Sequence, residues 1–341
     1  MQAYVIRRSI LDGFSFAFLV SALIVAVAQP TDEQILNMSF NTIIFAALYA
    51  LGIVVSAVLN QSNIPTMGEK LFQPAHKKSV EHKVWYKTFA GWHLVVLLLA
   101  LFIVGLFKTK FSINELLNED GFNGAIRLFK GIFSPNLDIL PKAILNIIET
   151  IFMAFMATVL AIPFAFVLSF VSAKNIMTGK LGYAIYITMR TIFNVMRSIE
   201  ALLWAIIFSV WVGIGPFAGM LALMIHSIAS LAKQYSEMVE TVDEGPIEGV
   251  QSCGANKLQT IWYAIVPQVV LPYVSFTVYR WDINVRMATI IGLVGGGGIG
   301  TLLVQYQGQA MWPEVGTIII VIAVVVWIMD QASAYIREAL K

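Results

Sequence analysis

Charged residues are scarce in this chain of 341 residues, where Asp, Glu, Lys and Arg together make up 12%. An ordinary soluble domain carries about 25%. Hydrophobic residues make up 58%, and the mean hydropathy is +0.79. Apolar surface in such excess predicts contact with lipid rather than one large core. The net charge of +2 gives no sign of nucleic acid binding.

Cysteine and histidine are also rare. The single cysteine, Cys253, excludes an internal disulfide and a cysteine metal cluster. The four histidines form neither an HExxH motif nor an HxxxH pair. No Walker motif is present, and the polar stretches are too short for a nucleotide-binding domain. An intramembrane enzyme would need a convincing His, Asp or Ser constellation within the spans, and none is seen.

Apolar runs are long and frequent. A helix needs about 20 apolar residues to cross the hydrocarbon core. Two of the runs exceed one crossing, and Pro163 and the glycine run 292–300 are their expected break points. The predicted spans are 10–29, 40–59, 90–107, 141–171, 198–214, 217–234, 272–303 and 315–336.

The distribution of Lys and Arg in short loops predicts both termini in the cytoplasm. Arg7 and Arg8 precede the first span, and the linker 60–88 is rich in lysine, whereas loop 305–314 has no Lys or Arg. The segment 109–138 should be external, because acidic residues nearly balance its basic ones.

The composition becomes more polar at residues 109–138, and this segment separates two apolar regions of the chain. Residues 1–108 are predicted to form an N-terminal membrane region of three helices, with a basic cytoplasmic linker at 60–88. Residues 109–138 form an external loop, and residues 139–336 form a second membrane region with a cytoplasmic loop at 237–267.

The N-terminus has features of a signal peptide. A basic start and an apolar run lead to Ala26–Ala28, which has small residues at both ends as a cleavage site does. Asp12 interrupts the apolar run, so an uncleaved first span is predicted.

The polar segment 237–267 stands out between apolar spans and reads EMVETVDEGPIEGVQSCGANKLQTIWYAIVP. A short surface helix is expected before Gly254, with a break near Pro246, and Gly254 can end it in a left-handed conformation. A second short helix at 256–265 should stop before Pro267. Two short helices joined by a glycine would form a knob that fits a groove on a cytoplasmic partner.

The spacing within this segment resembles the "EAA" loop of ABC importer permeases. That loop reads Glu-Ala-Ala, three residues, Gly, nine residues, Ile-x-Leu-Pro. Here Glu248, Gly249 and Val250 precede Gly254 by the same distance, and Ala264–Pro267 follows after nine residues. An ordinary amphipathic loop is the alternative. The proline at the right distance and the cytoplasmic location favour the EAA loop.

Other segments narrow the resemblance. Residues 278–289, VYRWDINVRMAT, are similar to the signature YRFEINVRAAT of phosphonate-importer permeases. The similarity covers about residues 139–336. The triplet Glu-Gly-Val departs from the family pattern, and the two extra N-terminal spans lie outside it. Further matching segments are Asp243–Pro246, Gly254–Gln259, Val266–Gln268 and Arg197–Leu202.

The resemblance implies an all-α polytopic membrane protein. Its core would be the five-helix type I ABC importer permease fold (MetI-like), with about three N-terminal transmembrane helices added. It implies a translocation subunit without enzymatic activity, in the cytoplasmic (inner) membrane of a prokaryote. The solute would be a phosphonate or a related phosphorus oxyanion such as phosphate or phosphite.

The resemblance also implies partners. Two ABC ATPase subunits would bind ATP and Mg, so no cofactor is expected on this chain. An extracytoplasmic phosphonate-type binding protein, a second permease copy or paralogue, and membrane lipid complete the set, without nucleic acid. The residues that the resemblance assigns to the ATPase-coupling loop are Glu248, Gly249, Val250, Gly254, Ala255 and Pro267.

Ionisable residues within the spans are candidates for the translocation path. Arg280, Asp282 and Arg286 fall in the seventh span, and Arg197 and Glu200 lie near the cytoplasmic edge of the fifth. Cations there would favour an anionic solute. The alternative for Asp282 and Arg286, four residues apart, is a buried structural pair. Snorkelling or a gate pair is the alternative for Arg197 and Glu200.

Two other functions remain open from the sequence. An ion-coupled secondary transporter would have broken helices with midplane carboxylates in paired repeats, and no internal repeat is seen. An ABC importer permease for another small solute is also possible. The glycine string Gly295–Gly300 is not a phosphate loop, because no strand precedes it and no GK[ST] follows. His226 is expected to be a core histidine rather than a metal ligand.

Overall fold

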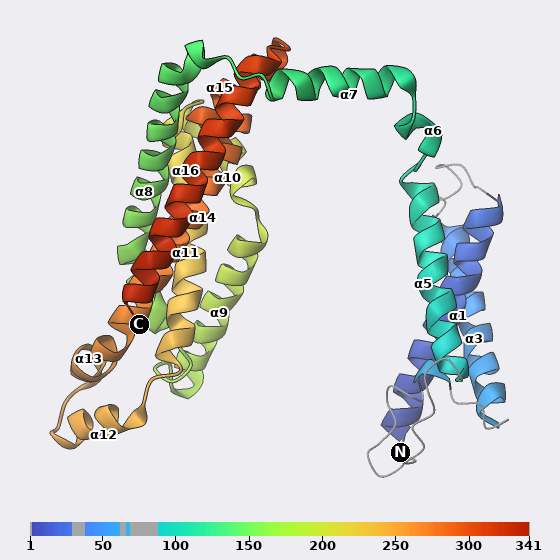
Figure 1. The fold of residues 1–341 in the computed structure, drawn as a ribbon. Coiled ribbons are helices and arrows are strands. Elements are labelled where there is room, and N and C mark those ends of the chain that lie inside the picture. Colours follow the sequence, from blue (N-terminus) through green and yellow to red (C-terminus); the bar gives the residue numbers. More distant parts are fainter. Residues whose placement is uncertain (1, 29–37, 62–65, 69–87, 341) are drawn as a thin grey trace. The chain divides into compact units, whose positions relative to one another are not determined.

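The structure is a computed structural model that describes residues 2–28, 38–61, 66–68 and 88–340. The part described is built from helices (Figure 1). The chain divides into two compact units, Met1–Gly121 and Phe122–Lys341, and each is described by itself. Most of the predicted linker 60–88 lies outside the described residues.

The N-terminal unit contains three long helices, α1 (Gln2–Ala28), α3 (Met38–Gln61) and α5 (Phe89–Lys108). Helix α1 packs against both α3 and α5. Gly13 and Gly52 let α1 and α3 approach closely, because a Cβ added to Gly52 would lie 2.9 Å from the Gly13 carbonyl oxygen. Small residues at such contacts are typical of helix pairs in membranes.

Asp12 is the polar anchor of this unit. Its side chain is fully buried and accepts hydrogen bonds from Ser56 Oγ and Thr66 Oγ1, each at 2.6 Å, and from Gly68 N at 2.7 Å. The carboxylate that interrupts the first apolar run therefore joins α1 to α3 and to the segment after it.

Two helices occupy the interval that the sequence predicts as an external loop. They are α6 (Ile113–Leu116) and α7 (Glu119–Ile132). Helix α7 is amphipathic, and its apolar positions Phe122, Ile126 and Phe129 are 58%, 40% and 57% exposed. They recur at helical spacing, so they form one stripe. A helix of this kind lies in the plane of a membrane interface.

We expect the apolar stripe of α7 to be shielded by lipid headgroups and acyl chains. With Cys253 replaced by serine, a membrane-impermeant maleimide in liposomes should modify Arg127→Cys at least about tenfold faster than Phe129→Cys, because the two lie on opposite faces. In the unfolded protein the two rates should be equal. Equal rates in liposomes would contradict an interfacial position.

The C-terminal unit is a bundle of long helices: α8 (Leu140–Val171), α11 (Pro216–Val239), α14 (Val266–Ile291) and α16 (Trp312–Ala339). Helices α8 and α11 make its most extensive contact, and α14 packs on both and on α16. The shorter helices are α9 (Gly179–Ser198), α10 (Ala201–Val212), α12 (Glu244–Ser252), α13 (Lys257–Thr260) and α15 (Ile299–Gly308). In Figure 1, α12 and α13 lie at one end of the bundle and α15 at the other.

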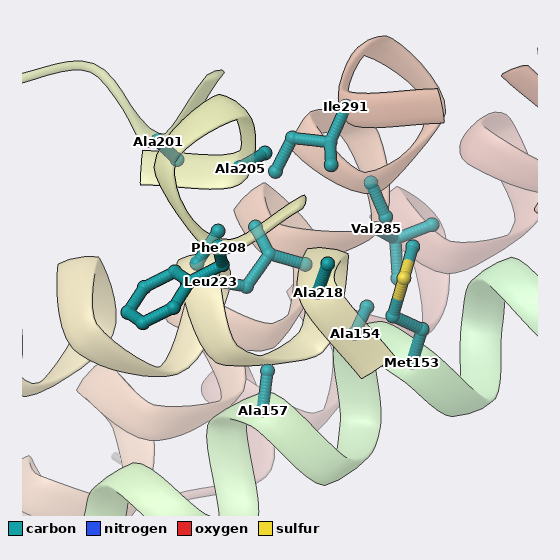
Figure 2. Close-up of a cluster of buried hydrophobic side chains, with 12 residues drawn as sticks. Met153, Ala154, Ala157, Ala201, Ala205, Phe208, Ala218, Leu223, Val285 and Ile291 are labelled. Atoms are coloured by element: carbon teal, nitrogen blue, oxygen red, sulfur yellow. The ribbon is translucent and has the colours of Figure 1, made fainter. Parts of the chain in front are cut away.

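Small residues hold the bundle together. Ala154 and Ala157 of α8 face Ala218 and Leu223 of α11, and Ala205 of α10 joins them (Figure 2). Because lipid tails are as apolar as leucine, close backbone approach and van der Waals contact stabilise such helix pairs. The alanine stripe of α8 therefore explains its extensive contact with α11.

Six of the described helical segments are long and apolar enough to cross a membrane, and a bent pair could form a seventh span. Five of the predicted spans each coincide with one of these segments: 40–59, 90–107, 141–171, 217–234 and 315–336. The predicted span 10–29 falls on α1 up to Ala28, and α1 is not among the six.

Two of the three remaining details of the span prediction require correction, and the third is confirmed. Helix α8 runs through Pro163 without interruption, so no break occurs there. The span 198–214 is half of a bent pair, in which α9 and α10 meet at 87°. The span 272–303 breaks at the glycine run, as expected: α14 ends at Ile291, and α15 begins at Ile299.

The glycine run between α14 and α15 makes this second break possible. Gly295, Gly297 and Gly298 have φ values of 90°, 79° and 69°, a region that favours glycine. The Gly295 carbonyl accepts a hydrogen bond from Gly215 N at 2.9 Å, and Ile299 N donates to Thr150 Oγ1 at 2.8 Å. The run is a packing turn against α8 and the start of α11.

Candidate coupling loop and buried polar cluster

The loop between α11 and α14 has the predicted knob. Helix α12 ends before Gly254, which has φ of 81°, and α13 begins after Asn256. Asn256 and Gln259 form a capping box, with Gln259 N donating to Asn256 Oδ1 at 2.9 Å and Asn256 N donating to Gln259 Oε1 at 2.8 Å. The left-handed glycine turn is therefore confirmed.

The two helices of the knob differ from the prediction in their limits. Residues before Gly254 are shared between the end of α11 and α12, and Pro246 lies in the first turn of α12 rather than at a break. The second helix does not stop before Pro267. A π-helical turn at Ile261–Ile265 continues into α14, and Pro267 is in the first turn of α14, where a helix tolerates proline.

Most of the residues assigned to the coupling loop lie together. Gly249, Val250, Gly254 and Ala255 line one shallow hollow beside α13. Glu248 lines a neighbouring hollow, between the knob and the turn after α8. Pro267 is exposed at the root of the knob and lines neither. The knob thus presents exposed backbone and the carboxylates of Glu244 and Glu248 at the end of the bundle.

Arg190 of α9 ties the root of the knob to its neighbours. Its Nη1 lies 2.9 Å from Glu240 Oε1, and its Nη2 lies 3.2 Å from Glu237 Oε1. Glu240 Oε1 also accepts a hydrogen bond from Lys174 N at 2.9 Å. Asn175 Nδ2 donates to the Val239 carbonyl at 2.7 Å. Sequence reasoning did not identify this role of Arg190, because its partners are 47 and 50 residues away along the chain.

A second contact joins the start of the knob to α14. Gln268 Oε1 accepts from Asp243 N at 3.0 Å, and Gln268 Nε2 donates to the Ala264 carbonyl at 2.8 Å. The start of the knob is therefore connected both to α9 and to α14. A force on the knob would reach both helices.

Replacing Arg190 by glutamine should weaken this connection more than it weakens folding. The ion pairs are partly exposed, with side chains 22–49% accessible, so they contribute about 0–1 kcal/mol to stability. We expect a fall in Tm of a few degrees at most, and a several-fold fall in solute uptake per ATP hydrolysed. Lys180→Gln, which removes an exposed lysine of α9, is the control. Unchanged coupling in Arg190→Gln would contradict the role.

A polar cluster is buried between α8, α11 and α14. Arg280 Nε donates to Ser227 Oγ at 3.1 Å. Asn284 Nδ2 donates to Ser227 Oγ and to Thr158 Oγ1, each at 2.8 Å. All four side chains are at least 93% buried. The sequence identifies Arg280 as a candidate, whereas Ser227, Asn284 and Thr158 are ordinary polar residues without a local motif.

The other path candidates are placed apart from this cluster. Arg286 pairs with Asp282, as the spacing of four residues predicts, and its Nη2 lies 3.8 Å from Asp330 Oδ1. Asp282 is buried, and Arg286 is 47% accessible. Arg197 and Glu200 are exposed at the bend between α9 and α10, close enough to Arg280 to interact electrostatically. No cluster of His, Cys, Asp or Glu that could hold a metal occurs among the described residues.

Comparison with known proteins decides the family. Residues 166–340 match the family described as "Binding-protein-dependent transport system inner membrane component". The chain belongs to this family. It is therefore a transport permease, and the five-helix importer core predicted for it is correct.

Two curated permeases of this family are similar to the chain. The phosphite transport system permease protein PtxC of Stutzerimonas stutzeri is 32% identical over 246 residues, which are 72% of this chain and 86% of that protein. The phosphate-import permease protein PhnE of Mycolicibacterium smegmatis is 34% identical over 221 residues, which are 65% of this chain and 41% of that protein.

A solved permease has the same fold. The MetNI methionine ABC transporter in an inward-facing conformation gives a TM-score of 0.53 at 21% identity, covering 60% of this chain and 99% of that one. The ABC importer permease fold decides against an ion-coupled secondary transporter.

Proposed function

We propose that this permease imports a phosphorus oxyanion (phosphite, phosphate or a phosphonate) with energy from ATP hydrolysed on partner subunits. The observation that carries the proposal is the knob α12–Gly254–α13, whose EAA-like spacing stands at one end of an importer-type bundle. The named substrates of the similar permeases, phosphite and phosphate, support the solute class.

In this proposal two ABC ATPase subunits bind ATP and Mg, and each receives one knob. Closure of the ATPase dimer moves the knob. The contact from Asp243 to Gln268 passes the movement to α14, and the contact from Glu240 to Arg190 passes it to α9. Because α9 meets α10 at a bend of 87°, movement of α9 also changes the bundle beside α14.

The complex needs two permeases, because a five-helix core forms half of a translocation path. A second copy or a paralogue supplies the other half. An extracytoplasmic binding protein delivers the anion at the end of the bundle opposite the knob, where α15 lies. Both termini are then cytoplasmic, on the same side as the ATPase.

Uptake in proteoliposomes tests the proposal. The permease is reconstituted with its ATPase and binding protein, and uptake of ³²P-phosphate, phosphite and methylphosphonate is compared with uptake of sulfate and methionine. We expect ATP-dependent uptake of at least one phosphorus oxyanion and none of methionine. Uptake of methionine, or of sulfate alone, would show that the solute class is wrong. Uptake without ATP would show that the energy source is wrong.

A further inference from the structure

Arg280 is a buried cation that lacks a complete set of partners. Its side chain is 7% exposed, and its Nη2 has no hydrogen-bond partner. Its one side-chain hydrogen bond goes to the neutral Ser227. Among the residues that the structure describes, no carboxylate lies within ion-pair distance of Arg280, whereas Arg286 on the same helix has two. Of these two arginines, Arg280 alone has a positive charge that no neighbouring carboxylate neutralises.

Burial of an unpaired cation is unfavourable. Removing one ion from water costs several kcal/mol, and the cost is recovered only when an opposite charge and further hydrogen bonds replace the water. Charged residues inside membrane helices accordingly mark substrate or ion pathways. An anion that reaches Arg280 would supply the missing charge.

The side chains around Arg280 suit an oxyanion. His226 on α11 is 9% exposed, interacts electrostatically with Arg280, and has no partner for its Nδ1. The Ser227 hydroxyl is already in contact with Arg280. Asn284 fixes Ser227 by a hydrogen bond of 2.8 Å, so the group is held in place before a ligand arrives. Arg280 supplies the donors, because guanidinium N–H groups bind phosphorus oxyanions in proteins. Ser227 donates its own hydroxyl to Asn284 Oδ1 at 3.2 Å and holds the guanidinium in place, and the unpartnered His226 Nδ1 can exchange a hydrogen bond with a P–OH group.

The bend between α9 and α10 stands beside these residues. His226 interacts with the backbone of Ile199, which lies in the bend, and the exposed Arg197 and Glu200 both act electrostatically on Arg280. Arg197 would attract an anion from the aqueous side, and Glu200 would oppose tight retention. A site in transit has to bind weakly enough to release its ion.

We propose that Arg280 and His226, supported by Ser227, form a transient binding point for a tetrahedral phosphorus oxyanion, which the α9–α10 bend covers and uncovers. The inference rests on the proposed function, since it names the place inside the bundle where the imported anion is held. Arg280 forms the charged fork, and Arg286 remains a structural partner of Asp282. The site thus has a single uncompensated cation.

Cysteine protection by inorganic phosphate tests this site without relying on transport. In the Cys253→Ser complex, Ser198→Cys places an exposed thiol in the bend. Inorganic phosphate should slow its reaction with maleimide at least about threefold, and chloride at equal ionic strength should not. Arg280→Gln should abolish the protection, whereas Arg127→Gln, a change in an exposed arginine of α7, should leave it intact. Equal protection in wild-type and Arg280→Gln complexes would overturn the proposal.

Uptake separates failure of the site from failure of the function. If the wild-type complex imports no phosphorus oxyanion, the proposed function is wrong. If it imports phosphate and Arg280→Gln imports it at the wild-type rate, the function stands and the site is wrong. We expect at least a tenfold loss in Arg280→Gln and a smaller loss in Arg280→Lys, because lysine keeps the charge without the fork. If the Arg280→Gln complex does not assemble, the His226→Leu complex is used for the cysteine-protection measurement. Weaker protection of Ser198→Cys by phosphate would support the site, and unchanged protection would overturn it.

Discussion

Replacing Gly254 by valine is expected to reduce ATP-driven uptake at least about tenfold while the membrane bundle stays folded. Gly254 has φ of 81°, and left-handed backbone costs an L-residue about 1–2 kcal/mol, with β-branched residues the least tolerant. No atom lies within 4 Å of a Cβ added there, so the effect would come from the backbone rather than from a clash. A changed turn would redirect α12, while the capping box of Asn256 keeps α13 in place.

Asparagine at the same position is the matched control. Asn adds a side chain of similar size, but it adopts the left-handed conformation far more readily than valine. Gly254→Asn should therefore retain most of the uptake, and both variants should show the Tm of the wild-type bundle. The ratio of uptake to ATP hydrolysis and co-purification of the ATPase are measured together. If both variants lose activity alike, exposed surface at Gly254, and not its backbone, is what the partner requires.

The left-handed turn at Gly254 could be predicted because it depends on one residue and its immediate neighbours. The pairing of Asp282 with Arg286 could be predicted for the same reason, since residues four apart in a helix share a face. Apolar length likewise located the long helices α8, α11 and α16. Each of these features depends on residues that are close together in the sequence.

Helix boundaries near proline and near polar residues were harder to predict from the sequence. A proline disrupts the interior of a helix but is tolerated in a helix's first turn. Pro267 was therefore compatible both with the end of the preceding helix and with the start of α14. Helix α9 was not expected, because its charges resemble those of a cytoplasmic connection. Its bend with α10 depends on packing against α11, which no local pattern records.

Contacts across the bundle escaped sequence reasoning altogether. The partners of Arg190 are 47 and 50 residues away along the chain, and those of Asn284 are 57 and 126 residues away. Nothing in the spacing of these residues states that they meet. The sequence therefore identified Arg280 and Arg286 as equal candidates for the path, and only their surroundings distinguish them.

Removing Arg286 should destabilise the protein much more than removing its exposed partner. Arg286→Gln leaves Asp282 as a carboxylate that is 1% accessible and unpaired, at a cost of about 3–5 kcal/mol. Asp330 also lies near Arg286 but is 52% accessible, so Asp330→Asn should cost about 0–1 kcal/mol. Thermal unfolding of the complex in nanodiscs measures both.

The double variant Arg286→Gln, Asp282→Asn tests whether the pair is structural. Neutralising both partners removes the buried charge, so most of the lost stability should return. Asp282→Asn alone should be milder than Arg286→Gln, because the freed arginine keeps Asp330, whose Oδ1 lies 3.8 Å from its Nη2. If the pair only supports packing, uptake should recover with stability in the double variant. Wild-type stability with lost uptake in Arg286→Gln would instead place Arg286 on the path of the anion. The assignment of Arg280 to the anion site and of Arg286 to a structural pair would then be wrong.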